Sequence, residues 1–344
     1  MKNKLLILAM YDLSVRNIAP ARRMRAIINT FQKINVPFES ISGSRKQRMN
    51  NALKLLFSKR TSDFSGVYIE STNSGMLFSE FLLLLKFRIK KIPISVYIRD
   101  IYPKYKQYWL WNNYRVIFAH LFWLFSYYVY KQMCKVIYVP SELMAQKLSL
   151  ENYKILPPGF SSSIELGRVK QNSIFYAGGT GPQYDIECFL LVCEKLSKEL
   201  DISVTFFCRK NEIKKIDKWQ SESWFNIHHK DLEQLDFQPQ IAVIPLTNSE
   251  YGNLAFPVKL MDYVSINTPM IVSNSTVTKN FVNRHEIGLV ADSGNMEDYY
   301  TKTKIILENR ELYTELLSNV YDLQKNPEIT WEYKCKQIIK DLSS

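Results

Sequence analysis

Residues 256–273 read FPVKLMDYVSINTPMIVS, and this stretch decides the fold class. Apolar residues at helical spacing end at Asn267-Thr268-Pro269, where a helix must break, and the apolar run of a buried strand follows at once. A short helix that leads directly into a buried strand is typical of a parallel sheet flanked by helices. Lys259 and Asp262 lie three residues apart, so they share one face of the predicted helix.

The pair of Lys259 and Asp262 has two interpretations. A local ion pair on an ordinary helix is common and only weakly stabilising, and spacing alone favours it. A cation and a carboxylate at the edge of a sheet also suit a nucleotide sugar. The cation would neutralise the diphosphate, and the carboxylate would accept hydrogen bonds from both ribose hydroxyls.

Strands and helices alternate on a short repeat along the chain, which predicts two tandem Rossmann-like domains. The expected strands are 5–9, 66–70, 93–98, 136–139, 153–156, 174–177, 204–208, 241–245 and 270–272. The predicted division has four parts, namely an N-terminal domain (1–160), a linker without periodicity (161–170), a C-terminal domain (171–325) and a C-terminal helix that packs back on the first domain (326–344).

Charge is divided unevenly along the 344 residues. Residues 1–160 hold 25 Lys and Arg against 8 Asp and Glu, a net charge of +17, whereas the rest of the chain is mildly acidic and brings the total to +12. So basic a half could face nucleic acid or an anionic membrane. No nucleic-acid-binding motif accompanies the charge, so no nucleic-acid partner is expected. The five cysteines show no CxxC spacing and predict reduced thiols in a cytoplasmic protein.

Residues 109–130 read WLWNNYRVIFAHLFWLFSYYVY, and lysines lie on both sides of this run. Trp and Tyr prefer the membrane interface, and each flanking lysine would add roughly 1 kcal/mol near an anionic leaflet. The run therefore predicts peripheral attachment to the inner face of the plasma membrane. The alternative is a helix that forms the hydrophobic flank of the first sheet.

Residues 178–181 read GGTG, between a predicted strand and a predicted helix. Small residues there let backbone N–H groups approach a phosphate, although a plain tight turn is as good an interpretation. The loop has neither the third glycine of a dinucleotide fingerprint nor the Gly-Lys-Ser/Thr ending of a P-loop. Because ligands of parallel sheets bind at the carboxyl ends of the strands, the loop and Lys259 are expected at one edge.

Several stretches in order resemble the retaining GT-B glycosyltransferases of family 4, the group 1 glycosyl transferases, and bacterial surface-polysaccharide members in particular. The matching stretches are ISVYIRDIYP, VIYVPSELMAQKL, ILPPGF, IFYAGGTG, LMDYVSINTPMIVS and HEIGLVADSGNMEDYYTKTKIILEN. The resemblance covers most of the chain. It implies a GT-B fold, two facing Rossmann-like domains with a central cleft, of which the first binds the acceptor and the second a nucleoside diphosphate sugar.

The resemblance also implies roles for the residues at matching positions. Asp262 would bind the donor ribose and Lys259 the diphosphate. The glycines of the loop would lie around the distal phosphate and the sugar, at positions Gly178, Gly179 and Gly181. Two departures stand out. The family usually has a Glu eight positions before the helix carboxylate, where this chain has Leu254, and usually an Arg and a Lys after the glycine loop, where this chain continues PQYDIE. Neutralisation of the phosphates would then fall to Lys259, Arg209 or Lys210.

The first domain contributes a second set of candidates. Arg99 and Asp100 close a predicted strand and are expected to contact a phosphate and an acceptor or donor hydroxyl, unless they form a plain strand-end ion pair. Asn17, Arg22 and Arg23 lie in the first strand-to-helix connection and suit a diphosphate-linked acceptor, or else form a solvated helix face.

The function expected from these features is metal-independent transfer of a sugar from a UDP-sugar to a lipid-linked or glycan acceptor in surface-polysaccharide assembly, with retention of configuration. No cofactor and no metal site are expected, because no DxD motif is present. Two alternatives stay open: a sugar-nucleotide epimerase of the same fold, and a catalytically degenerate glycosyltransferase-like binding partner.

Overall fold

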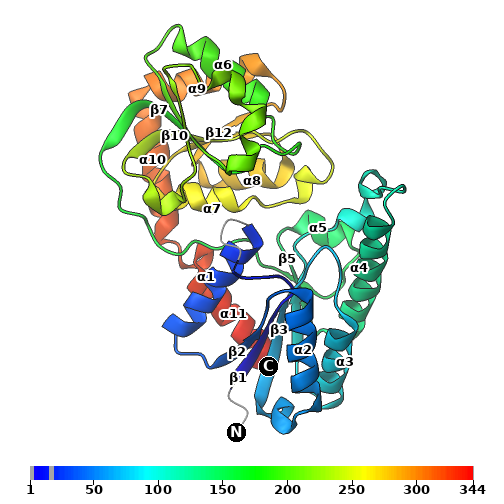
Figure 1. The fold of residues 1–344 in the computed structure, drawn as a ribbon. Coiled ribbons are helices and arrows are strands. Elements are labelled where there is room, and N and C mark those ends of the chain that lie inside the picture. The colour runs from blue at the N-terminus through cyan, green and yellow to red at the C-terminus, as the bar shows by residue number, and fades with distance from the viewer. Residues whose placement is uncertain (1–3, 15–18, 344) are drawn as a thin grey trace. The chain divides into compact units, whose positions relative to one another are not determined.

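The computed structural model describes residues 4–14 and 19–343 and divides the chain into two compact units. The first unit runs to Pro157 and is completed by the segment from Trp331 onward, and the second runs from Pro158 to Thr330. Each unit contains one six-stranded, fully parallel sheet covered by helices (Figure 1). The predicted pair of Rossmann-like α/β units is therefore confirmed.

The first sheet has the strand order β2-β1-β3-β4-β5-β6. Its strands are β1 (Lys4–Ala9), β2 (Phe38–Ile41), β3 (Phe64–Glu70), β4 (Ile94–Tyr97), β5 (Val136–Val139) and β6 (Tyr153–Ile155). The helices of this unit are α1 (Ala19–Lys33), α2 (Arg45–Phe57), α3 (Phe78–Ile89), α4 (Tyr114–Met133), α5 (Glu142–Lys147) and α11 (Trp331–Ser343). The order reverses between β1 and β3, so the segments that follow these two strands diverge to opposite faces.

The C-terminal helix α11 packs on the first sheet beside α1 (Figure 1). Trp331, Cys335 and Ile338 of α11 are buried in the same core as Leu5 and Ile7 of β1. Two polar contacts add to this apolar packing. The Asp341 carboxylate accepts a hydrogen bond from Tyr138 Oη at 2.8 Å and pairs with Lys154. The end of the chain thus completes one face of the first unit.

The second sheet has the order β12-β11-β10-β7-β8-β9. Its strands are β7 (Val169–Ala177), β8 (Ser203–Phe207), β9 (Phe225–His228), β10 (Gln238–Ile244), β11 (Met270–Ser273) and β12 (Gly288–Ala291). The helices are α6 (Ile186–Ser197), α7 (Val258–Ser265), α8 (Thr276–His285), α9 (Met296–Glu308) and α10 (Arg310–Lys325). Renumbered within the unit this order is 6-5-4-1-2-3, that of dinucleotide-binding Rossmann folds, and its reversal lies between β7 and β10.

Local sequence signals explain how the elements of the second unit begin and end. Asp185 caps α6, where its carboxylate accepts a hydrogen bond from the backbone N–H of Cys188. The predicted break after α7 is confirmed. Asn267 adopts a left-handed φ of 51°, and β11 begins directly after Pro269. The stretch 256–273 thus forms the helix and the buried strand that its pattern predicts.

Candidate functional site

The candidate donor site lies at the carboxyl ends of β7 and β10, two neighbouring strands of the second sheet. Residues 178–181 follow β7, and the segment after β10 leads into α7, which carries Lys259 and Asp262. A reversal of strand order leaves space between the two diverging connections, which is why ligands of open α/β sheets bind there. The glycine loop and Lys259 therefore meet at the place where a nucleotide site is expected.

Lys259 has an unusual environment for a lysine. The residue is only 7% exposed, and its ammonium lies over the rings of Tyr184, at 3.7 Å from the ring centroid, and Tyr176, at 4.0 Å. The ammonium donates a hydrogen bond to Tyr176 Oη at 2.7 Å. Burial lowers the pKa of Lys259 well below its ordinary value of 10.5, while the carboxylates of Asp262 and Glu212 act in the opposite direction. The cation is thus held mainly by aromatic rings and one hydroxyl.

Glycine is required at position 178 by the approach of Lys259. Gly178 has a φ of 149°, and the end of the Lys259 side chain occupies the space that a Cβ atom would need. The turn is fixed by two hydrogen bonds, from Gly178 N to Phe207 O at 2.8 Å and from Tyr176 Oη to Gly179 O at 2.5 Å. Gly178, the first of the glycines predicted to bind a ligand, therefore lies against Lys259, whereas Gly179, the second, lies against the side chains of Glu212 and Arg209. Gly181, the third, lies against the Gln183 side chain.

Arg209 lies next to the same loop. Its guanidinium forms an ion pair with Glu212, and a Cβ atom added at Gly179 would lie 3.5 Å from Arg209 Nη2. The Glu212 carboxylate also accepts a hydrogen bond from the backbone N–H of Thr180 at 3.0 Å. The structure thus brings together Arg209, Lys259 and the glycine loop, around a carboxylate that the sequence did not predict there.

Asp262 lies one helical turn beyond Lys259 and is partly exposed. The Lys259 ammonium donates its hydrogen bond to Tyr176, and the Asp262 carboxylate acts on it through space. The Lys259 ammonium thus has a tyrosine hydroxyl as hydrogen-bond partner, and the Asp262 charge favours its protonated form as well. Leu254, at the position where the resembled family has a Glu, is buried at 8% exposure.

The first unit places its predicted residues in three different environments. Arg99 and Asp100 follow β4 and form an ion pair, with 2.6 Å between Arg99 Nε and Asp100 Oδ2, and both side chains are partly buried. Arg22 is exposed on α1. Asn17 lies outside the described residues.

Arg23 differs from its neighbour Arg22, because it is buried at 3% exposure. Its Nε lies 2.9 Å from Glu70 Oε1, and its guanidinium stacks over Tyr97 at 3.6 Å and Trp331 at 4.9 Å from the ring centroids. These contacts stabilise the packing of α1 against β3, β4 and α11. They do not test the predicted contact of Arg23 with an acceptor.

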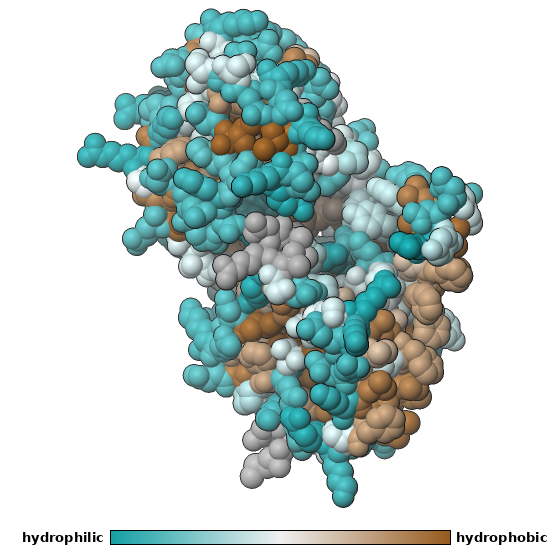
Figure 2. All heavy atoms as spheres, in the orientation of Figure 1, coloured by the Kyte–Doolittle hydropathy of each residue, from teal (hydrophilic) through white to brown (hydrophobic). Residues whose placement is uncertain are grey.

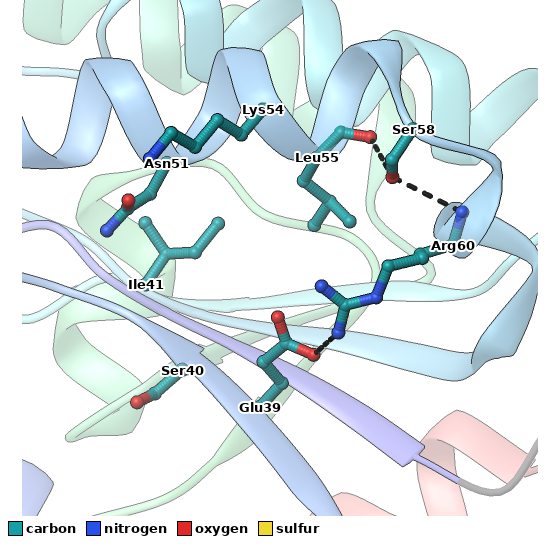
Figure 3. Close-up of a pocket in the computed structure, with 8 residues that line it drawn as sticks. All are labelled: Glu39, Ser40, Ile41, Asn51, Lys54, Leu55, Ser58 and Arg60. Atoms are coloured by element: carbon teal, nitrogen blue, oxygen red, sulfur yellow. Dashed lines mark hydrogen bonds and ion pairs between the residues drawn. The ribbon is translucent and has the colours of Figure 1, made fainter.

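Two further features lie outside the candidate donor site. In the described part of the chain no group of three or more His, Cys, Asp and Glu side chains is arranged to hold a metal ion. A pocket of about 260 Å³ lies between β2 and α2, where Arg60 is already paired with Glu39 at 2.6 Å (Figure 3). The pocket lies at a sheet edge, beside the outermost strand, and no residue predicted for function lines it.

The structure is similar to several solved proteins, although no protein-family model and no curated protein matches the chain. Anabaena Alr3699/HepE in complex with UDP superposes with a TM-score of 0.69 at 10% identity, covering 99% of both chains. A glycosyltransferase from Rickettsia africae has the same TM-score at 9% identity, covering 99% of this chain and 98% of its own. Sucrose-phosphate synthase from Thermosynechococcus elongatus has a TM-score of 0.67 at 8% identity, covering 98% of each chain. Together with the two parallel sheets, these similarities identify the fold of the chain as GT-B.

Proposed function

We propose that the protein is a glycosyltransferase that binds a nucleoside diphosphate sugar in its second unit. The observation that carries this proposal is Lys259, a buried cation at the carboxyl ends of β7 and β10 whose close neighbours are aromatic rings, a hydroxyl and a glycine loop. A buried ammonium stays charged only where an anion or a comparable partner compensates the loss of water, and a diphosphate is such an anion. UDP and UDP-glucose bound to the similar Anabaena protein make a UDP-sugar the first donor to test.

In this proposal each candidate site residue of the second unit has one role. Lys259 and Arg209 neutralise the diphosphate, which is the leaving group, and Gly178, Gly179 and Gly181 give it close access to the backbone. The Asp262 carboxylate accepts hydrogen bonds from the ribose hydroxyls. Protein cations rather than a metal ion stabilise the departing charge, and transfer retains the configuration of the sugar. These assignments rest on the geometry above and on the resemblance of the sequence.

The acceptor side is proposed for the first unit. Arg99 and Asp100, at the end of β4, would contact the acceptor or the donor sugar, and Arg22 a phosphate of a lipid-linked or glycan acceptor. Asn17 and Arg23 belong to the same proposed set. Such an acceptor belongs to surface-polysaccharide assembly at the inner face of the plasma membrane.

An apolar face on α4 supports the membrane side of the proposal. Six exposed side chains, between 46% and 64% exposed, recur on one side of this helix: Tyr114, Phe118, Leu121, Phe122, Phe125 and Tyr128. Figure 2 shows hydrophobic atoms gathered along the side of the first unit that α3 and α4 form. Exposed lysines lie before the helix at 104 and 106, in its last turn at 131, and after it at 135. Within the described residues, no helix is both long and apolar enough to cross a bilayer.

Vesicle binding tests this face. We expect co-sedimentation with vesicles that contain phosphatidylglycerol, weaker binding to phosphatidylcholine alone, and a decrease with salt. Replacing Phe118 and Phe125 by serine should weaken binding at least about tenfold, because each ring contributes about 1–2 kcal/mol when it enters the interface. Phe57→Ser is the matched control, since Phe57 is 84% exposed on α2. Equal losses in both variants, or binding indifferent to lipid charge and salt, would remove the membrane proposal.

Donor binding is tested by a thermal-shift screen against UDP, GDP and their sugar conjugates, followed by a transfer assay.

A second candidate function is supported by the similarity to a putative UDP-N-acetylglucosamine 2-epimerase from Listeria monocytogenes. The two structures superpose with a TM-score of 0.58 at 10% identity, covering 98% of this chain and 95% of the other. An epimerase converts its nucleotide sugar without an acceptor, so turnover in the absence of acceptor favours it. Binding without turnover in either assay favours a degenerate partner.

A further inference from the structure

Glu212 is an unusual neighbour for a glycine loop. It lies in a 3-10 turn (Lys210–Lys215) after β8, and its side chain is 16% exposed. One carboxylate oxygen accepts the hydrogen bond from the Thr180 backbone N–H, and the other pairs with Arg209. The backbone of Glu212 is joined to the same loop, because Thr180 Oγ1 donates to Glu212 O at 3.1 Å. A negative charge is thus held at the centre of the candidate donor site.

The groups that hold Glu212 are those that bind phosphate in proteins. A backbone N–H in a glycine loop and a guanidinium are typical phosphate ligands. The carboxylate lies very close to the loop, since a Cβ atom added at Gly179 would be 3.1 and 3.2 Å from its two oxygens. Its charge also reaches Lys259, where it counteracts the lowering of the pKa by burial. Two cations and one backbone donor therefore act on a single internal anion.

We propose that the Glu212 carboxylate occupies the place of a donor phosphate in the free protein and is displaced when the diphosphate binds. The inference rests on the proposed function only in naming the diphosphate as the competing anion. Until the diphosphate binds, Glu212 is the partner of Arg209 and of the Thr180 N–H. Because a carboxylate and a phosphate repel each other, the two cannot hold Arg209 and the Thr180 N–H at the same time, and the Glu212 side chain thereby sets the affinity of the site for anions.

The opposite role, a brace that shapes the loop for its ligand, predicts the opposite sign of effect. If Glu212 competes, then Glu212→Gln should bind anions more tightly, because the amide keeps the size of the side chain and loses its charge. If Glu212 braces the loop, the same substitution should weaken binding.

The test is isothermal titration calorimetry with inorganic pyrophosphate and, separately, with UDP. We expect Glu212→Gln to bind pyrophosphate about tenfold more tightly than the wild type, a change of about 1.4 kcal/mol. Glu187→Gln is the control. It removes the same charge from an exposed position of the second unit, where the side chain is 72% exposed, and should leave the affinity unchanged. Unchanged or weaker pyrophosphate binding by Glu212→Gln would overturn the inference, as would an equal gain in the control.

Hydrogen exchange of the wild type gives a second measurement that needs no variant. Displacement of Glu212 by UDP or pyrophosphate should speed amide exchange in the turn at Lys210–Lys215, whereas a brace would make exchange there slower on binding. The pyrophosphate arm also separates this inference from the proposed function. Tighter pyrophosphate binding by Glu212→Gln without binding of any nucleotide would support the anion site and refute the nucleotide-sugar proposal.

Discussion

Replacing Lys259 by methionine should separate ligand binding from folding, because it should weaken binding of the diphosphate and leave the stability of the protein nearly unchanged. Methionine has a similar length and fits between the rings of Tyr176 and Tyr184, so the apolar packing of the residue is kept. The substitution loses one hydrogen bond to Tyr176, about 0.5–1.5 kcal/mol, but also removes a buried charge whose desolvation opposes folding. The free energy of unfolding in the absence of ligand should therefore change by less than about 1 kcal/mol.

The loss of UDP affinity should be much larger. A charge-assisted hydrogen bond contributes about 1.5–3 kcal/mol, so its loss should raise the dissociation constant for UDP roughly 10- to 150-fold. Calorimetry measures this loss directly, and a thermal-shift assay should show a near-normal melting temperature with little response to UDP. Lys198→Met is the matched control, because Lys198 is exposed at the end of α6. A Lys259→Met protein that folds and binds UDP as tightly as the wild type would refute the assignment of Lys259 to the diphosphate.

The lowered pKa of Lys259 adds a pH dependence with a defined sign. Below 10.5 the unfolded chain binds a proton at this lysine more readily than the folded protein does, so the stability of the free protein should rise as pH increases toward 10.5. A diphosphate favours the charged ammonium, so UDP binding should take up a proton and weaken over the same range. Titrations at about pH 7 and 9.5 measure both slopes, and Lys259→Met should reduce both. A wild-type UDP affinity that rises with pH would contradict the argument.

Three further predictions concern the neighbouring groups. Asp262→Ala should weaken UDP binding by about 1–3 kcal/mol through the lost ribose contacts, and unchanged affinity in calorimetry would exclude that role. A chelator such as EDTA should leave UDP binding and sugar transfer intact, and an absolute requirement for a divalent metal in the transfer assay would contradict the proposed mechanism. Arg23→Ala should lower the free energy of unfolding by about 3–5 kcal/mol in denaturant titrations, because it leaves Glu70 buried without its partner, and a loss under 1 kcal/mol would show that the buried pair does not stabilise the unit.

The sequence predicted the central strands and missed edges of the sheets. Strands such as β3, β7 and β10 each contain at least four consecutive buried residues, and each therefore carries a short run of adjacent apolar residues that marks it in the sequence. The three strands that were not predicted, β2, β9 and β12, are all edge strands of four residues. An edge strand pairs on one side only and is partly exposed, as in the FESI sequence of β2, so it carries little periodicity.

The candidate site was predictable where it depends on residues close in sequence. The glycine loop and the Lys259–Asp262 helix each carry a local pattern, and sheet topology explains why they meet. Tyr176, Tyr184 and Glu212 were missed because their role is tertiary. Nothing in the local sequence relates a tyrosine at the end of β7, or a carboxylate in the turn after β8, to a lysine on α7. Only the position of Tyr176 just before the glycine loop was a signal that could have been used.

The partners of the cations argue for a binding site over a structural ion pair. The charges of Asp262 and Glu212 both act on Lys259, yet its hydrogen bond goes to the Tyr176 hydroxyl and its remaining neighbours are ring faces. A cation kept only for stability gains most from a direct carboxylate partner, since an ammonium buried without one opposes folding. Rings and a hydroxyl hold the charge more weakly than a direct carboxylate contact does, which leaves Lys259 suited to the proposed contact with a diphosphate. Arg209 has the complementary arrangement, because a carboxylate already holds it and an incoming phosphate must compete. In the proposed site the two cations would therefore make different contributions: Lys259 would attract the anion, and the Arg209–Glu212 pair would determine which anions bind strongly enough to displace the carboxylate.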